Sequence, residues 1–146
     1  MAPIVKQLLL VSVYLGLFTS ISAQAFTKIE FNSQTRGYQK SVVFEKSTVH
    51  FVLNSISEKK DTTFPIAKKD WLRLHSLVKN MPLKDLPDWK GSTEGSATDR
   101  ALASTITIVT KNNTYTSQTF DNYQAPKKLL PIMAIVRKYS QSALSD

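Results

Sequence analysis

Apolar and polar residues alternate over several short stretches of this chain, and a period of two residues predicts β-strands. Three such stretches, residues 28–32, 41–44 and 48–53, lie close together. The breaks between them are too short for a crossover, so we expect an antiparallel meander. A longer alternation over residues 103–120 is interrupted by Lys111-Asn112-Asn113. Because Asn tolerates positive φ, this stretch predicts a hairpin with a tight primed turn at Asn112-Asn113.

Two longer segments have apolar residues at the spacing of an amphipathic helix. In residues 67–80, the apolar stripe contains Trp71, Leu74 and either Leu77 or Val78, and Leu72 broadens it. Pro82 predicts that this helix has ended by that point.

Residues 126–139 predict the second helix, with two adjacent apolar stripes. One stripe contains Leu129, Met133 and Val136, and the other contains Ile132, Ile135 and Tyr139. Proline is tolerated in the first turn, where backbone N–H groups have no partner within the helix. Pro131 therefore predicts a helix that begins near Lys127 or Lys128, or one that kinks. We expect residues 140–146 to fray.

The remaining segments are polar or rich in small residues. Residues 54–63 predict an exposed loop, and residues 91–99, rich in Gly, Ser and Thr, predict a mobile one. The order of elements is thus β-β-β-α-β-β-α. Two amphipathic helices can cover one face of a five-strand, mainly antiparallel sheet, so we predict a single α+β domain.

The N-terminal residues have the order of a secretory signal peptide. A short segment with Lys6 precedes an apolar run over residues 8–18, and small residues follow up to Ala23-Gln24-Ala25. The alternative is a membrane anchor, but the apolar run is shorter than the roughly 20 residues that a span needs. We therefore predict a signal peptide at residues 1–25 and a domain at residues 26–146, with cleavage one or two residues earlier as the alternative. The protein would be exported, to the periplasm or as a secreted protein, with no stable membrane span after cleavage.

Composition adds two constraints. The chain has no Cys, so an exported domain must be stabilised by packing rather than by disulfides. The formal net charge is +8, which favours polyanions such as nucleic acid, glycans or lipid head groups. The Lys and Arg residues are spread along the sequence, so we attribute the charge to solubility and expect no specific nucleic-acid partner. A polyanion-binding surface is the alternative.

Recognisable catalytic motifs are absent from the sequence. No zinc pattern, phosphate loop, dinucleotide fingerprint or nucleophile elbow occurs, and neither His50 nor His75 has acidic residues at ligand spacing. We therefore expect no metal, no cofactor and no enzymatic activity. The alternative is an enzyme in which two carboxylates meet in space as general acid and base. The candidates for such a pair are Asp85, Asp88, Glu94, Asp99 and Asp121.

One local cluster is the first candidate for binding. Arg36, Gly37, Tyr38 and Lys40 fall on one expected turn. Tyr offers rigid contact area and Arg a planar fork of donors, as in a recognition tip. The other interpretation is an ordinary β-turn in which Gly37 supplies a positive φ.

The second candidate is the pair Asp99 and Arg100, at the end of an exposed loop over residues 91–100. The other interpretation is a solvent-exposed connection with one local ion pair. Asp121 follows the predicted hairpin, and we expect its carboxylate to accept backbone N–H bonds in a turn. A Ca²⁺ or carbohydrate site at Asp121 and Asn122 would lack enough oxygen ligands nearby.

The order of elements and some local sequence resemble emfourin-type domains, a family that includes proteinaceous inhibitors of thermolysin-like metalloproteases. The chain is also similar to small exported bacterial proteins. The shared features are Ile29 to Phe31 before Gly37, Trp71, Leu74 and Leu77 before Leu83 and Leu86, Asp99 before a strand, and Pro126 to Leu130 at the last helix. The resemblance implies an α+β fold and a protein partner. We therefore expect an exported, non-enzymatic protein-binding module, in its sharpest form a protease inhibitor.

Overall fold

The computed structural model describes residues 25–145, so the predicted signal peptide lies outside them except for Ala25. The strands are β1 (Phe26–Thr35), β2 (Tyr38–Glu45), β3 (Thr48–Ser55), β4 (Lys59–Pro65), β5 (Ala103–Thr110), β6 (Thr114–Thr116) and β7 (Phe120–Asp121). The helices are α2 (Lys68–Lys79) and α3 (Leu130–Ser145), with short 3₁₀ helices η1 (Leu83–Asp88), η2 (Ser96–Thr98) and η3 (Lys127–Leu129). Between residues 25 and 145, neither helix combines the length and the apolar character that crossing a bilayer requires.

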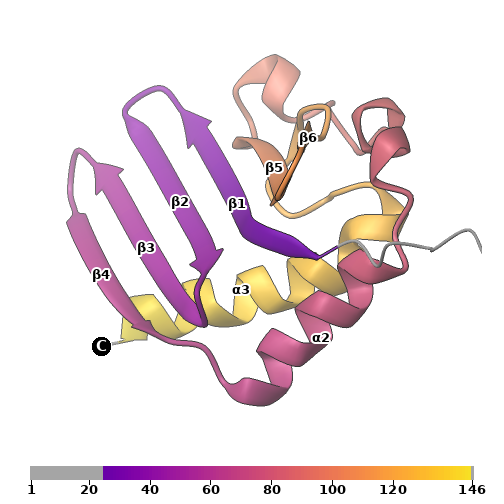
Figure 1. The fold of residues 1–146 in the computed structure, drawn as a ribbon. Helices are drawn as coiled ribbons and strands as arrows, with labels where there is room; N and C mark the ends of the chain where they lie inside the picture. The colour runs from indigo at the N-terminus through magenta and orange to yellow at the C-terminus, as the bar shows by residue number, and fades with distance from the viewer. Residues whose placement is uncertain (1–24, 146) are drawn as a thin grey trace, which may run out of the picture.

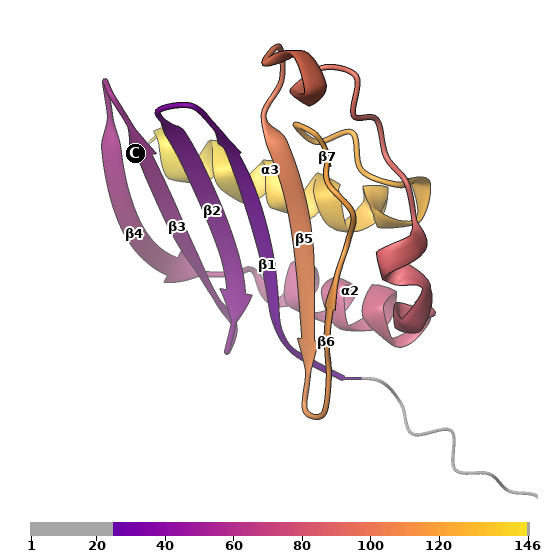
Figure 2. The same ribbon diagram turned by 90° about the horizontal axis from the view of Figure 1, so that it is seen from above.

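All strands belong to one antiparallel sheet in the order β4-β3-β2-β1-β5-β6, with β7 beside β5. Both helices lie on the same face of this sheet (Figures 1 and 2). In Figure 2 the sheet is seen face-on with α3 crossing beneath it, and no described helix covers the near face. The α+β class, the meander β1-β2-β3 and the pair of helices on one face are therefore confirmed.

The strand alternation decides which side chains reach the core between sheet and helices. The buried strand residues include Ile29, Phe31, Val42, Phe44, Val49, Phe51, Ile106 and Ile108. They meet buried residues of the helical side, among them Leu74, Val78, Leu83, Leu86, Leu129, Ile132, Met133 and Val136. Burial of apolar surface is the dominant favourable term in folding, and no disulfide adds to it here because the chain has no Cys.

The sheet has seven strands, so the prediction of five is wrong. One missed strand is β4, which occupies part of the expected loop at residues 54–63 and pairs with β3 along its whole length. Its side chains are mostly polar, but an edge strand needs only one neighbour and little apolar burial. Phe64 supplies that burial, with its ring 6.2 Å from the ring of Tyr139.

The second strand of the predicted hairpin is divided into β6 and β7, which accounts for the other strand beyond the five expected. Ser117 bonds β5 twice, through its N–H to the carbonyl of Ile106 (2.9 Å) and through its Oγ, which accepts from the N–H of Ile106 (3.0 Å). The next pair joins Ser104 to Phe120. Two steps along β5 thus correspond to three along its partner, and this extra residue breaks the ladder into β6 and β7.

The primed hairpin turn is at a different position from the one expected. Lys46 and Ser47 both have positive φ (49° and 62°) in the two-residue loop between β2 and β3. Asn112 and Asn113 are not among the residues with positive φ, so the primed turn predicted there is wrong. Gly37 has φ 75° in the β1–β2 turn, as its position suggested.

The helices are confirmed with two corrections. Leu72 does not broaden the buried stripe of α2, because it is 57% exposed while Asp70 is buried instead. The 3₁₀ helix η3 precedes α3, so Pro131 lies in the first turn of α3, where proline is tolerated. Fraying after Tyr139 is also wrong up to residue 145, because α3 continues and buries Ser140 and Ala143.

Candidate binding surface at the hairpin end of the sheet

Two hairpin tips lie together at one end of the sheet. The β1–β2 turn and the β3–β4 loop both point upward in Figure 1. Between them is an open hollow of about 550 Å³, lined by residues 34–35, 37–39, 54–56 and 59. Because strand order places β1 to β4 consecutively, the antiparallel register brings these segments to the same end without any long connection.

Ile56 is the most exposed large apolar side chain of this surface, at 95%. It lies over Gly37, where an added Cβ would come 3.2 Å from its Cδ1. Its loop is held by hydrogen bonds between Ser55 and Glu58, including Ser55 N–H to the Glu58 carbonyl at 2.8 Å and Glu58 N–H to Ser55 Oγ at 2.9 Å. The fold therefore presents an isoleucine to solvent on a well-bonded turn.

The outer edge of β4 adjoins this surface and offers backbone groups. Ser55 N–H bonds the carbonyl of Glu58, and Ile66 N–H bonds the carbonyl of Ser47. In an antiparallel ladder such bonds recur at every second residue, so Lys60, Thr62 and Phe64 are the β4 residues that bond β3. The backbone groups of Lys59, Asp61 and Thr63 consequently face outward from the sheet.

The structure separates the residues of the first predicted cluster. Arg36 and Gly37 are exposed at the tip, and Tyr38 is half-buried against the core. Lys40 is only 6% exposed, so its placement on the exposed tip is wrong. It points to the helical side of the sheet, because it pairs with the buried residues Ser33 and Leu53, and its Nζ donates to the Tyr123 hydroxyl at 2.6 Å.

Asp99 and Arg100 are both exposed, and Asp99 has a left-handed backbone (φ 56°) at the end of η2. Within the described residues the two side chains form no ion pair. They lie on the loop after η1, which Figure 2 shows at the same end as the hairpin tips but beyond β5. The two predicted groups therefore do not form one contiguous site.

Asp121 holds the loop that carries these two residues. Its carboxylate accepts the N–H of Gly95 (2.7 Å), the N–H of Ser96 (2.8 Å) and the hydroxyl of Ser92 (3.0 Å). The bonds from Ser96, followed by those from Gly95 and Ser92, lower the pKa of Asp121 from 3.8 to about 2, although burial opposes them. Asp121 therefore accepts backbone N–H bonds, as expected, but from the loop of residues 92–96 and not within its own turn. The loop expected to be mobile is bonded at its centre.

The other candidate carboxylates do not share that environment. Asp85, Asp88, Glu94 and Asp99 are exposed. A general acid needs a raised pKa at neutral pH, whereas the pKa of Asp121 is lowered and its oxygens are already occupied. Among residues 25–145, no group of three or more His, Cys, Asp and Glu side chains is arranged to hold a metal.

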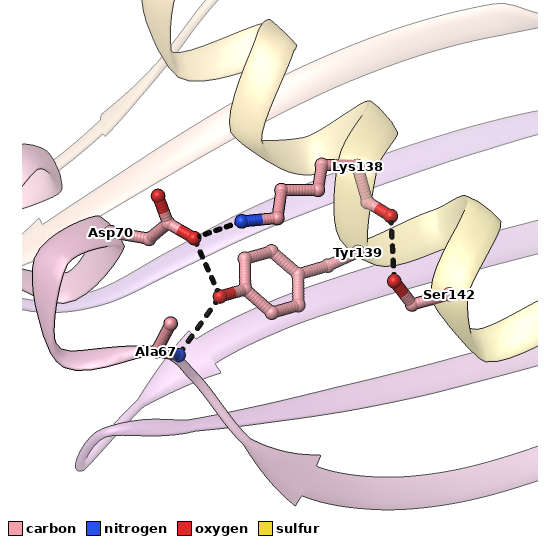
Figure 3. A network of polar contacts seen from close by, with 5 residues as sticks. All are labelled: Ala67, Asp70, Lys138, Tyr139 and Ser142. Atoms are coloured by element: carbon pink, nitrogen blue, oxygen red, sulfur yellow. Dashed lines mark hydrogen bonds and ion pairs between the residues drawn. The ribbon is translucent and has the colours of Figure 1, made fainter.

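A second buried carboxylate joins the two helices (Figure 3). Asp70 Oδ2 accepts from Lys138 Nζ (2.6 Å) and from the Tyr139 hydroxyl (2.8 Å), and that hydroxyl accepts the N–H of Ala67 (2.9 Å). The bond from Lys138 and then that from Tyr139 lower the pKa of Asp70, while burial raises the pKa of Tyr139. Neither pKa shift prepares a group for proton transfer at neutral pH. The role that the hydrogen bonds support is structural, because they join α2 to α3.

Sequence reasoning missed Ile56 and the edge of β4. The available signals were a single isoleucine in the otherwise polar run Ser55-Ile56-Ser57-Glu58, and an apolar Phe64 at the end of residues 59–65. A lone apolar residue between polar ones is typical of an exposed position, but its function depends on its neighbours in space.

No protein-family model and no curated protein sequence matches this chain.

Proposed function

We propose that this protein is an exported, non-enzymatic module that binds another protein at the hairpin end of its sheet. The observation that carries the proposal is Ile56, 95% exposed beside a hollow and next to the outer edge of β4. An isoleucine this exposed could be buried in an apolar pocket of a partner, as side chains at the core of protein interfaces are. Arg36, Gly37 and Tyr38 border the same region and supply a polar rim.

The partner would contribute an extended segment that continues the sheet. The outward backbone groups of Lys59, Asp61 and Thr63 are those that an added strand would bond, and Ile56 would contact an apolar side chain at one end of it. A protease whose cleft accepts an extended chain has matching chemistry, so inhibition of a thermolysin-like metalloprotease is the sharpest form of the proposal.

The test uses two substitutions in the proposed contact and matched controls. Thr63→Pro removes an outward N–H and leaves the bonds to β3 in place, since proline is tolerated on an edge strand where its N–H would face solvent. Thr63→Val keeps that N–H. Ile56→Ser removes the anchor, and Leu72→Ser removes an exposed apolar side chain from the other side of the molecule.

The measurement is capture of a protein from the producing organism's envelope and culture fluid, followed by the affinity of each variant for it. A panel of purified metalloproteases is assayed in parallel. We expect Thr63→Pro and Ile56→Ser each to weaken binding roughly tenfold or more, and the two controls to bind as the original chain does. A partner that binds all four variants equally would contradict the proposed surface, and the absence of any partner would contradict the proposed function.

A further inference from the structure

The positive charge of the protein is concentrated in its helical layer. Residues 66–90 and 126–145, which contain α2, η1, η3 and α3, carry ten Lys and Arg against three Asp, a net +7. Residues 26–65 and 91–125, which contain the sheet, carry eight Lys and Arg against seven Asp and Glu, a net +1. Basic residues that are spread along the sequence are therefore gathered by the fold on the side that faces away from the open sheet.

Six of the ten basic residues of this layer lie on adjoining exposed parts of α2 and η3. Lys68, Lys69, Arg73 and Lys79 are exposed on α2, and the only acidic residue of that helix, Asp70, is turned inward to Lys138. Lys127 and Lys128 are exposed on η3. The two groups adjoin, because Ser76 and Asn80 of α2 line the same hollow as Lys128.

Apolar side chains are interleaved with these charges. Leu72 is 57% exposed beside Arg73, and Leu130 is 45% exposed next to the two lysines of η3. The hollow between α2 and η3, about 360 Å³, is lined by Leu77, Met81 and Pro82 with Lys128 among them. Clusters of basic residues on an amphipathic helix are typical of surfaces that bind anionic lipid, and the protruding leucines could enter the interfacial region of the bilayer.

We propose that the helical layer binds the surface of an anionic lipid bilayer, with the lysines and arginines at the phosphates and Leu72 and Leu130 in the interfacial region. Charge complementarity supplies long-range attraction to anionic head groups, at about fivefold in affinity for each basic residue near the surface. Nucleic acid or an acidic glycan would use the same charges but would gain nothing from exposed leucines, so the bilayer is the partner that accounts for both features.

The orientation is compatible with the binding surface proposed above and does not depend on it. The helical layer would face the lipid, and the open face of the sheet would face away from it. The hairpin tips and the edge of β4 would stay accessible. A protein partner and a bilayer would therefore be bound by different residues, and each proposal can fail alone.

The test measures sedimentation of the chain from Phe26 to Asp146, which contains every described strand and helix, with phosphatidylcholine vesicles and with vesicles that also contain phosphatidylglycerol. Arg73→Gln with Lys127→Gln removes two charges from the proposed surface. Lys59→Gln with Lys111→Gln removes two exposed charges from β4 and from the turn between β5 and β6. Leu72→Gln tests the apolar contribution, with Ile56→Gln as its control. Thermal unfolding followed by circular dichroism verifies that each variant is folded.

We expect binding to the phosphatidylglycerol vesicles only, and weaker binding as salt is raised. The Arg73 and Lys127 variant should bind on the order of 20-fold more weakly, and Leu72→Gln roughly tenfold more weakly. The Lys59 and Lys111 variant and Ile56→Gln should bind as the original chain. Failure to bind anionic vesicles, or an equal loss in both double variants, would overturn the proposal. Unchanged vesicle binding by Leu72→Gln, together with equally tight retention on heparin or duplex DNA, would assign the surface to polyanions in general and would also overturn it.

Discussion

Asp121 is the residue whose ionisation most directly stabilises a loop of this protein. Its carboxylate accepts three hydrogen bonds from residues 92–96, and its pKa is lowered to about 2. A lowered folded-state pKa means that the stabilisation is fully present above the unfolded value of 3.8 and is lost as the pH falls through about 2. We predict that this part of the pH dependence of unfolding, between about pH 4 and pH 2, disappears in Asp121→Asn.

The same substitution should loosen the loop at neutral pH. The amides of Gly95 and Ser96 would lose their charged acceptor, so their hydrogen exchange should become faster. Asp99→Asn is the control, since Asp99 is exposed on the same loop and Asn tolerates its left-handed backbone. Equal exchange rates in the two variants would contradict the assigned role of Asp121.

Tyr139 performs at the start of α2 the function that a capping side chain performs elsewhere. Ala67 is the N-cap residue and offers no side-chain acceptor, but its N–H donates to the Tyr139 hydroxyl, which in turn donates to Asp70 three residues into the helix. A capping box joins those two positions directly, and here the hydroxyl bridges them. We predict that Tyr139→Phe lowers the free energy of unfolding by about 1–3 kcal/mol, measured by chemical denaturation.

The matched control for that substitution is Tyr115→Phe. Tyr115 is half-buried, and within residues 25–145 its hydroxyl makes no hydrogen bond. Removing that hydroxyl should leave the free energy of unfolding nearly unchanged. If Tyr139→Phe were equally mild, the network of Figure 3 would contribute little to stability.

At the scale of elements, substitutions in α3 can separate the contribution of packing to stability from that of helix propensity. Ala143 is buried in the last turns of the helix, and Ala134 is exposed on the same helix. Glycine costs about 1 kcal/mol in a helix interior, and the loss of a buried methyl group adds roughly 0.8 kcal/mol. We predict that Ala143→Gly destabilises the protein by about 2 kcal/mol and Ala134→Gly by about 1 kcal/mol. A cost near zero for Ala143→Gly would mean that the end of α3 frays after all.

The elements that could be predicted from the sequence are those whose burial is periodic. The meander and both helices bury a regular set of side chains, so their pattern survives in the sequence. β4 could not be predicted in this way, because its position at the edge leaves most of its side chains in solvent. The burial of Asp70 and the exposure of Leu72 could not be predicted for a related reason. The inward position of Asp70 depends on Lys138 and Tyr139, which come from a helix almost seventy residues later.

The candidate site was predictable only in part, for a similar reason. The turn at Gly37 could be located from its residue types, and Arg36 and Gly37 are exposed there. Lys40 looked equally exposed from its charge, but strand alternation turns it under the sheet to Tyr123. Ile56 carries no local signal of function, since the role proposed for it depends on its position over Gly37 in a neighbouring hairpin.

At the scale of the whole molecule, the antiparallel order separates three kinds of surface. The segments that form the sheet and its loops have almost no net charge, the hairpin end presents Ile56 and the edge of β4, and the segments of the helical layer carry nearly all of the net positive charge. This separation arises because strands alternate polar residues outward, while α2 and η3 concentrate lysines on the side away from the core. The two proposed partners therefore require different variants to disrupt, which makes them separable by experiment.

The first residue of the predicted mature chain is part of the core. Phe26 is buried at the start of β1, with its ring stacked on His75 at 4.2 Å and in edge contact with Trp71 at 5.1 Å. Cleavage after Ala25 would keep this ring, whereas a chain that begins at Thr27 would lack it.

Burial of a phenylalanine contributes about 2 kcal/mol. We therefore predict that the chain beginning at Phe26 is more stable than the one beginning at Thr27 by about that amount, measured by chemical denaturation. For the proposed signal-peptide cleavage, we also predict that mass spectrometry of the mature protein finds an N-terminus no later than Phe26. Equal stability of the two chains would show that the aromatic cluster with Trp71 and His75 does not hold the start of the sheet, and a mature N-terminus beyond Phe26 would contradict the proposed cleavage site.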